Sequence, residues 1–215
     1  MISPEAMARK QRSIDLLKAE GIPYIDHLPV IESEAESIRR SDEEVARRAI
    51  ALCFVAAKGE GIEQSMIERM ISDYDAASAF TPQEHAFISD PDPNEHDRVQ
   101  FVWRYECYWV MLWALGFVEA LGRPDHICDV GASVVILRDL GREGFMNRAK
   151  LRPQAELLDA ADLIYRYAWA CADARINGRE APAGLEPGVV HERHYALNWL
   201  IGYGQQEWDD ISTDT

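Results

Sequence analysis

Apolar side chains recur along this chain at the three- to four-residue spacing of α-helices, and helix-start and helix-stop residues frame these stretches. Ser3 and Pro4 suit the start of a first helix, and Gly21 suits its end. The next stretch, residues 22–40, contains two prolines, which predicts an extended connection that packs against the rest of the chain.

Capping boxes predict the starts of two further helices. The motif Ser-x-x-Glu at residues 41–44 precedes a long apolar stripe, and we expect Gly59 and Gly61 to end that helix. Another helix is expected over residues 62–74. The motif Thr-Pro-Gln-Glu at residues 81–84 predicts a short helix after it.

The middle of the chain is its most apolar part. Residues 95–121 are apolar almost all round and rich in Trp and Tyr, which predicts one helix in the centre of the fold. Residues 130–140 contain a β-branched run that fits a strand or a buried helix, and Asp129 as a possible cap favours the helix.

Two more helices are predicted towards the carboxyl terminus. Pro153 opens the clearest amphipathic pattern, which ends near residues 177–178, and the last helix is expected over residues 189–202. Trp208 and Ile211 are expected to hold the tail against the fold.

The chain has no fixed-period repeat and no alternation long enough to require a sheet. We therefore predict an all-α protein, a single-domain orthogonal helical bundle with irregular connections over residues 1–215. The helix and connection of residues 1–40 are expected to pack onto a core of residues 41–215.

The net charge of the chain excludes some classes of binding partner. The 215 residues carry a formal net charge of −15, which argues against nucleic-acid binding. Residues 59–97 alone contribute −9, with Arg69 as their single basic residue besides histidine. This segment is either a solvated surface or a docking face for a basic protein partner.

No membrane or secretory segment is expected. The apolar run 107–118, which has no charged residue, is 12 residues long, whereas a membrane-spanning helix needs roughly 20. The amino terminus has no apolar signal region, and the cysteines form no Cys-x-x-Cys pair. Free thiols in a cytoplasmic protein are therefore expected. The four cysteines are Cys53, Cys107, Cys128 and Cys171.

Charged residues within apolar stretches are the main candidates for a site. Arg104 and Glu106 interrupt the central helix, and Arg193 falls on the apolar stripe of the last one. Buried charges must pair, so we expect the two arginines to meet carboxylates among Glu106, Glu156 and Asp159. Such a cluster either fixes the register of the helices or forms a polar pocket for acid–base chemistry. The candidate cluster comprises Arg104, Glu106, Glu156, Asp159, Arg193 and His194.

Metal and cofactor signals are weak. The acidic loop at residues 90–97 lacks the glycine and the final glutamate of an EF-hand. His191 and His194 are three residues apart and would supply at most two zinc ligands. The charged stripe of residues 156–173 is a solvated face, an internal ion-pair network or a catalytic site. No nucleophile or nucleotide-binding motif occurs, and we expect no cofactor and no metal.

Several longer segments together resemble a known family. They are WRYECYWVMLWALG at 103–116, PDHICDV at 124–130, ELLDAADLIYRYAW at 156–169, ERHYALNWL at 192–200 and WDDISTDT at 208–215. In these segments the chain resembles the bacterial family catalogued as domain of unknown function 4272. The resemblance implies a cytosolic bacterial protein with one mainly helical domain, and it implies no activity or catalytic residue.

Two functional hypotheses follow from the sequence. The first is a binding or accessory module that uses an acidic surface or an aromatic-lined groove. The second is a small-molecule enzyme or ligand-binding protein, with or without the help of a metal ion, whose site lies in the buried polar cluster. A concavity large enough for a ligand, roughly 300 Å³ or more, would favour the second.

Overall fold

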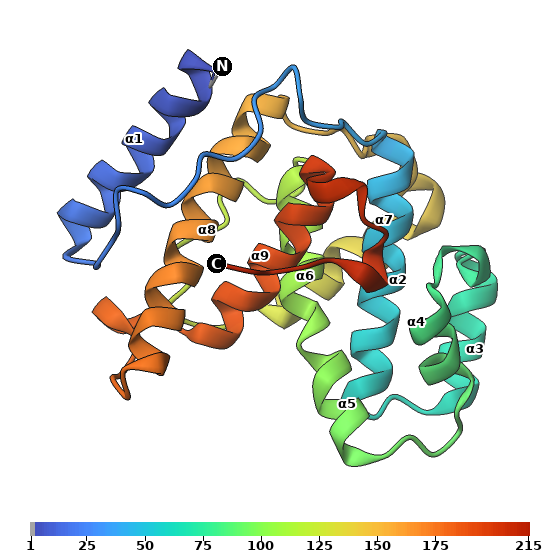
Figure 1. Cartoon of the computed structure of the whole chain (residues 1–215). Coiled ribbons are helices and arrows are strands. Elements are labelled where there is room, and N and C mark those ends of the chain that lie inside the picture. Colours follow the sequence, from blue (N-terminus) through green and yellow to red (C-terminus); the bar gives the residue numbers. More distant parts are fainter. Residues whose placement is uncertain (1–2) are drawn as a thin grey trace. The chain divides into compact units, whose positions relative to one another are not determined.

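The computed structural model describes residues 3–215, and these residues contain helices and connections but no β-strand (Figure 1). The predicted all-α class is therefore confirmed. The chain divides into two compact units. The first unit comprises Met1–Arg40, Gly122–Ile127 and Arg152–Thr215, and the second comprises Ser41–Leu121 and Cys128–Leu151. The arrangement as a single domain stays a prediction. No helix within residues 3–215 has the length and apolar character needed to cross a bilayer.

The second unit is organised around one long buried helix, α2 (Asp42–Glu60). Almost every residue of α2 between Val45 and Gly59 is buried, because other helices of the unit cover it on several sides. These helices are α3 (Gln64–Asp73), α4 (Pro82–Ser89), α5 (Glu95–Val102), α6 (Arg104–Ala114) and α7 (Val130–Arg148), and a short 3-10 turn, η1 (Ala77–Ala79), precedes α4.

The ends of α2 follow the sequence signals with one correction. The Ser41 hydroxyl accepts a hydrogen bond from the Glu44 backbone, and the Glu44 side chain accepts one from Ser41, so the predicted capping box is confirmed. Gly61 ends the helix with a left-handed φ of 102°. Gly59 does not end it but lies inside the last turn, where the backbone of α5 passes too close for a side chain.

The central apolar stretch forms two helices instead of the single helix predicted over residues 95–121. α5 ends at Val102 and α6 begins at Arg104, with Trp103 between them still at right-handed angles (φ −59°, ψ −20°). The helical stretch stops at Ala114, because Gly116 takes a left-handed φ of 79° that turns the chain away.

The ambiguous segment after Asp129 is a helix. The Asp129 carboxylate accepts a hydrogen bond from the Ala132 backbone at 2.9 Å, as a helix cap does. Gly141 interrupts α7 with φ 61° and ψ 177°. The weak preference for helix over strand is therefore confirmed, and the helix extends beyond the predicted residue 140 with a kink.

An apolar cluster holds α3, α4 and α5 at one end of α2. Ile67, Phe87 and Val55 are buried together, and the ring of Phe87 stacks on Phe101 with centroids 4.1 Å apart. The buried Lys58 ammonium adds a polar tie, because it donates hydrogen bonds to the carbonyls of Ile88 and Asp90 and to the Gln64 side chain. Apolar contacts and the hydrogen bonds of Lys58 therefore both stabilise the packing of α3, α4 and α5 at this end of α2.

The first unit consists of α1 (Pro4–Glu20), α8 (Gln154–Ile176) and α9 (Pro187–Ile201) with their connections, and Figure 1 shows α1 lying alongside α8. The sequence predicted these three helices to within two residues at each end. Short 3-10 turns complete the unit: η2 (Pro182–Gly184), η3 (Tyr203–Gln205) and η4 (Trp208–Asp210).

The extended connection and the tail both pack as predicted. Gly21 ends α1 in a left-handed conformation, and the Lys10 ammonium then donates hydrogen bonds to the carbonyls of Asp26 and Leu28 at 2.5 and 2.7 Å. Trp208 and Ile211 are buried. Residues 22–40 and the tail thus belong to the packed part of the first unit.

Candidate functional site

Two of the predicted cluster residues, Arg104 and Glu106, lie in the first turn of α6 in the second unit. Glu106 is 2% exposed, and its carboxylate accepts a hydrogen bond from the Cys128 backbone. A carboxylate in the first turn of a helix also interacts favourably with the helix dipole. Glu106 therefore links the start of α6 to the segment that leads into α7, while the half-buried Arg104 lies 3.9 Å from the Cys107 sulfur.

Arg193 and His194 lie on α9 in the first unit, and both are buried. Arg193 donates a hydrogen bond to the Gly122 carbonyl at 3.0 Å. His194 Nε2 is 3.2 Å from the Asn198 side-chain nitrogen, so Nε2 accepts and the proton sits on Nδ1. Burial and, to a lesser extent, nearby His191 together lower the pKa of His194 to about 4, so the imidazole is neutral at pH 7.

His191 and His194 differ in exposure and are not grouped with a third possible metal ligand among the described residues. His191 is exposed, whereas His194 is 2% exposed beneath the surface of the same helix. Among residues 3–215, no three His, Cys, Asp or Glu side chains are grouped so that they would hold a metal ion.

Glu156 and Asp159 lie on α8, where arginines other than Arg104 and Arg193 neutralise them. Glu156 pairs with Arg152 at 3.1 Å. Asp159 pairs with two arginines of α1, at 3.1 Å from Arg9 and 2.6 Å from Arg12. The structure therefore brings Asp159 together with residues that the sequence analysis did not select. The pairing of Arg104 and Arg193 with Glu106 stays a prediction.

The charged stripe of α8 is ion-paired, but only its middle is buried. Asp162 and Arg166 are 0% and 1% exposed, and two hydrogen bonds of 2.7 and 2.9 Å join their side chains. Glu156, Asp159 and Asp173 also pair with arginines, yet their side chains remain 49%, 46% and 30% exposed. The stripe is therefore an internal ion pair at Asp162 and Arg166 and a partly solvated face elsewhere.

A cavity of about 160 Å³ opens between α1 and α8 in the first unit. It is lined by Arg9, Arg12, Ser13, Leu16, Asp159 and Leu163. The four residues of α1 follow the i, i+3, i+4, i+7 spacing of one helix face, and the two residues of α8 are four apart. The cavity is therefore a groove between two facing helix surfaces.

Buried Arg9 fixes the polar end of this cavity. It is 1% exposed, and its guanidinium donates to Asp159 Oδ1, to the Glu32 carbonyl and to the Glu5 carboxylate. All three nitrogens of the guanidinium are thus engaged. Because Asp159 Oδ1 accepts from both Arg9 and Arg12, the Asp159 side chain is held at the rim in one orientation.

Several polar atoms at the same cavity have no partner among residues 3–215. Ser13 is only 6% exposed, yet its hydroxyl makes no hydrogen bond to another residue that the structure describes. Within the same residues, Asp159 Oδ2 and the Nε and Nη1 atoms of Arg12 also make none. The cavity therefore presents an acceptor, a hydroxyl and cationic donors to whatever occupies it.

The sequence analysis missed Arg9, Arg12 and Ser13. The available signal was an arginine and a serine four residues apart on the face of the first helix that also carries its apolar residues. Charge stands out more clearly in the Trp-rich centre of the chain, where Arg104 and Glu106 interrupt an almost wholly apolar stretch.

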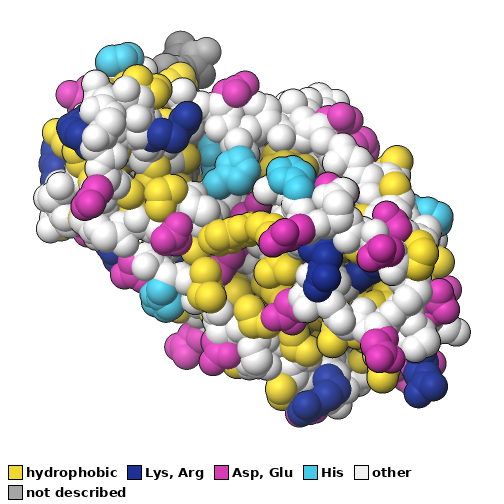
Figure 2. Space-filling model, turned by 90° about the horizontal axis from the view of Figure 1, so that it is seen from below, with side chains coloured by type: hydrophobic (Ala, Val, Ile, Leu, Met, Phe, Trp, Pro, Cys, Tyr) yellow, Lys and Arg dark blue, Asp and Glu magenta, His cyan; other side chains and the backbone are white. Residues whose placement is uncertain are grey.

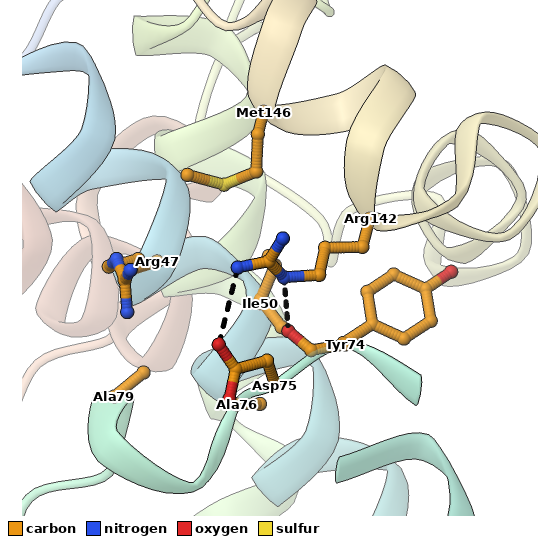
Figure 3. Close-up of a pocket in the computed structure, with 8 residues that line it drawn as sticks. All are labelled: Arg47, Ile50, Tyr74, Asp75, Ala76, Ala79, Arg142 and Met146. Atoms are coloured by element: carbon orange, nitrogen blue, oxygen red, sulfur yellow. Dashed lines mark hydrogen bonds and ion pairs between the residues drawn. The ribbon is translucent and has the colours of Figure 1, made fainter. Parts of the chain in front are cut away.

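A second hollow, in the second unit, is too small for a ligand. It holds about 10 Å³, which is room for about one water molecule. Figure 3 shows the Arg142 guanidinium bonded on one side to the Tyr74 carbonyl and on the other to the Asp75 carboxylate. This hollow lies where the hydrogen bonds of Arg142 join α7 to the loop after α3.

The helices and the cavities define the chain as an all-α protein without a recognisable catalytic constellation among its described residues. Comparison with family models then identifies it more closely: residues 9–211 match the model described as domain of unknown function (DUF4272). The chain belongs to this family, as its resemblance indicated. No curated protein and no solved structure matches it.

Proposed function

We propose that this protein is a binding module that docks a basic partner protein on the acidic face of its second unit. The proposal rests on how few of the carboxylates in residues 59–97 are paired with a basic side chain of the described residues. Of their ten carboxylates, Glu84 pairs with Arg48 and Asp75 pairs with Arg142, and Glu60 accepts a hydrogen bond from Tyr105.

The other seven carboxylates have no basic side chain within ion-pair distance among the described residues. We call these seven the acidic face, a name for the segment of sequence that they share; they are Glu63, Glu68, Asp73, Asp90, Asp92, Glu95 and Asp97. Six of them are exposed and Asp97 is half-buried. A surface with this excess of one charge attracts an oppositely charged partner and orients it during approach.

Apolar side chains accompany the acidic face. Ile62 and Met66 are 42% and 48% exposed at the start of α3, next to Glu63. Figure 2 shows acidic side chains dispersed among hydrophobic ones on the face seen there, instead of gathered in one block. Such a mixed surface suits a partner segment that is both basic and apolar, such as an amphipathic basic helix.

The cellular setting that we propose is the bacterial cytoplasm. All four cysteines are free, and three of them are buried. Unpaired thiols are typical of proteins in reducing compartments. A strongly acidic chain is also a poor ligand for nucleic acid, so the proposed partner is a protein.

A synthetic peptide tests the docking proposal. The probe is a fluorescent amphipathic helix of lysine and leucine, and a peptide with glutamate in place of lysine is its counterpart. Fluorescence anisotropy at 50 and 300 mM NaCl measures binding to the full chain. We expect the lysine peptide to bind and the glutamate peptide to fail, with affinity that falls as salt rises.

A matched pair of triple variants localises the binding. The test variant carries Glu63→Gln, Glu68→Gln and Asp73→Asn. The control carries the same kinds of change at exposed positions elsewhere, Glu180→Gln, Glu207→Gln and Asp214→Asn. Both variants change the net charge by three. We expect about tenfold weaker binding for the first and less than about threefold for the second. Equal losses, or no binding to the unaltered protein, would refute the proposal.

A ligand-binding function is the second candidate, and the cavity between α1 and α8 favours it. At about 160 Å³ the cavity lies below the 300 Å³ expected of a drug-sized site. Of the predicted cluster, only Asp159 lines it. The class of ligand that this cavity suits is argued separately below.

A further inference from the structure

We propose that the cavity between α1 and α8 binds a small zwitterion, an α-amino acid with an apolar side chain. The inference does not depend on the acidic face, which belongs to the second unit, whereas all six residues that line the cavity belong to the first.

The size of the cavity sets the first limit. Its volume is about 160 Å³. A nucleotide or a drug-sized cofactor needs several hundred Å³, so only a compact molecule fits. A free amino acid of moderate size is in the right range.

The polar atoms without a hydrogen bond limit the chemistry of the ligand, because they belong to a negatively charged carboxylate and a positively charged guanidinium group. Two arginines hold Asp159 Oδ1, but Oδ2 of the same carboxylate accepts no hydrogen bond from a described residue and suits an ammonium group. Arg12 Nε and Nη1 are cationic donors that suit a carboxylate. A ligand with only one charged group would leave one of these two sites unused.

Ser13 adds a hydroxyl to the wall of the cavity. The residue as a whole is 6% exposed, and its hydroxyl makes no hydrogen bond to another described residue, so it is available to a ligand. Ser13 lies one turn from Arg9 and next to Arg12 along α1, at the polar end of the cavity. There it is able to donate to a ligand carboxylate that Arg12 also holds.

The remaining wall is apolar. Leu16 is 41% exposed and Leu163 is half-buried, and both line the cavity. An apolar side chain between them would remove their exposed surface from water, which is favourable. The charged and apolar ends together match the two ends of an amino acid such as leucine.

Isothermal titration calorimetry of the full chain with L-leucine tests the proposal, together with two analogues of the same shape. The first analogue, 4-methylpentanoate, lacks the ammonium group, and the second, 3-methylbutylamine, lacks the carboxylate. We expect L-leucine to bind with a dissociation constant in the range of about 10 µM to 1 mM, as a ligand of nine heavy atoms allows. Each analogue should bind about tenfold more weakly or not at all.

Two variants and a control tie the binding to the cavity. Ser13→Ala removes a hydroxyl that holds no other residue, and Asp159→Asn keeps an acceptor for Arg9 while it removes the charge. Each should weaken binding about tenfold. The control, Asp173→Asn, alters another arginine-paired carboxylate of α8 and should bind as the unaltered protein does. Thermal unfolding of each variant confirms that it remains folded.

Three results would overturn the proposal. One is the absence of binding by L-leucine at 10 mM. Another is equal binding by the two analogues, which would exclude recognition of a zwitterion. The third is equal weakening by Asp173→Asn and Asp159→Asn, which would place the ligand elsewhere. Two-dimensional NMR adds a direct measurement, because the amide shifts on titration should centre on residues 9–16 and 159–163.

Discussion

Asp162 and Arg166 form a buried ion pair one turn apart on α8, with side chains that are almost fully removed from solvent. Two parallel hydrogen bonds of 2.7 and 2.9 Å join them, and Arg166 also donates to the Pro29 carbonyl at 3.3 Å. The pair thus attaches the extended connection after α1 to the middle of α8. It stabilises the helix assembly on which the neighbouring cavity depends.

Removal of one partner of this pair should destabilise the protein strongly. We expect Asp162→Leu to lower the free energy of unfolding by roughly 3–5 kcal/mol, because the Arg166 charge is left buried without a counterion. The double variant Asp162→Leu with Arg166→Met should recover most of that loss, since Arg166 Nη1 is already buried without a hydrogen bond. Urea unfolding followed by circular dichroism measures both.

An exposed ion pair provides the control for this experiment. Glu43 and Arg47 are 3.0 Å apart on the surface of α2. Glu43→Gln should cost less than about 1 kcal/mol, because solvent screens the pair. An equal cost for Asp162→Leu and Glu43→Gln would contradict the role given to burial.

The buried imidazole of His194 should make stability depend on pH. In the unfolded chain it takes up a proton near pH 6.5, whereas burial lowers its pKa to about 4 in the folded protein. The unfolded state therefore binds more protons between these values, and stability falls as the pH drops from about 6.5 to about 4. The full loss is on the order of 3 kcal/mol.

Urea midpoints at pH 7 and pH 4.5 check this dependence. His194→Gln should reduce the difference between the two midpoints, because glutamine does not titrate. His96→Gln, at an exposed position, should leave the difference unchanged. A pH dependence that is identical in His194→Gln and the unaltered protein would show that other groups cause it.

Helix positions were predictable from this sequence because the end signals act locally. The boxes at Ser41 and Thr81 and the cap at Asp129 each depend on residues within one turn, and all three form as predicted. The division of the central stretch was not predictable, since neither glycine nor proline marks the break at Trp103 between α5 and α6.

The partners of charged side chains were much harder to predict, because they depend on which helices meet. Glu106 was correctly predicted to be buried, but its carboxylate accepts from the backbone of Cys128, 22 residues away. Asp159 pairs with Arg9 across 150 residues of sequence. Periodicity identifies the face of a helix on which a residue lies, but it contains no information on the helix opposite.

The buried thiols should differ in their reactivity. Burial raises the pKa of Cys53 to about 12 and that of the half-buried Cys171 to about 11. Because the thiolate is the reactive form, both should react slowly with iodoacetamide at pH 8, and Cys53 more slowly than Cys171. Mass spectrometry of labelled peptides over time measures the two rates. In 8 M urea the rates should converge, and faster labelling of Cys53 in the folded protein would contradict its burial.

The close approach of α2 and α5 at Gly59 leads to a last prediction. A Cβ atom at this position would lie 2.8 Å from the Arg98 carbonyl oxygen and 2.9 Å from the Val102 backbone nitrogen. Backbone atoms cannot move aside as the end of a side chain does, so α5 would have to shift. We expect Gly59→Ala to lower the free energy of unfolding by about 1–3 kcal/mol, although alanine is the better helix former.

A second helical glycine, with room for a side chain, provides a control that separates the effect of packing from that of helix propensity. At Gly131, in the first turn of α7, a Cβ would meet only Asp129 Oδ1 at an ordinary 3.5 Å. Gly131→Ala should therefore raise the free energy of unfolding by up to about 1 kcal/mol. Hydrogen exchange should show faster exchange of α5 amides in Gly59→Ala alone. If both variants are more stable than the unaltered protein, α2 and α5 do not approach as closely as Gly59 implies.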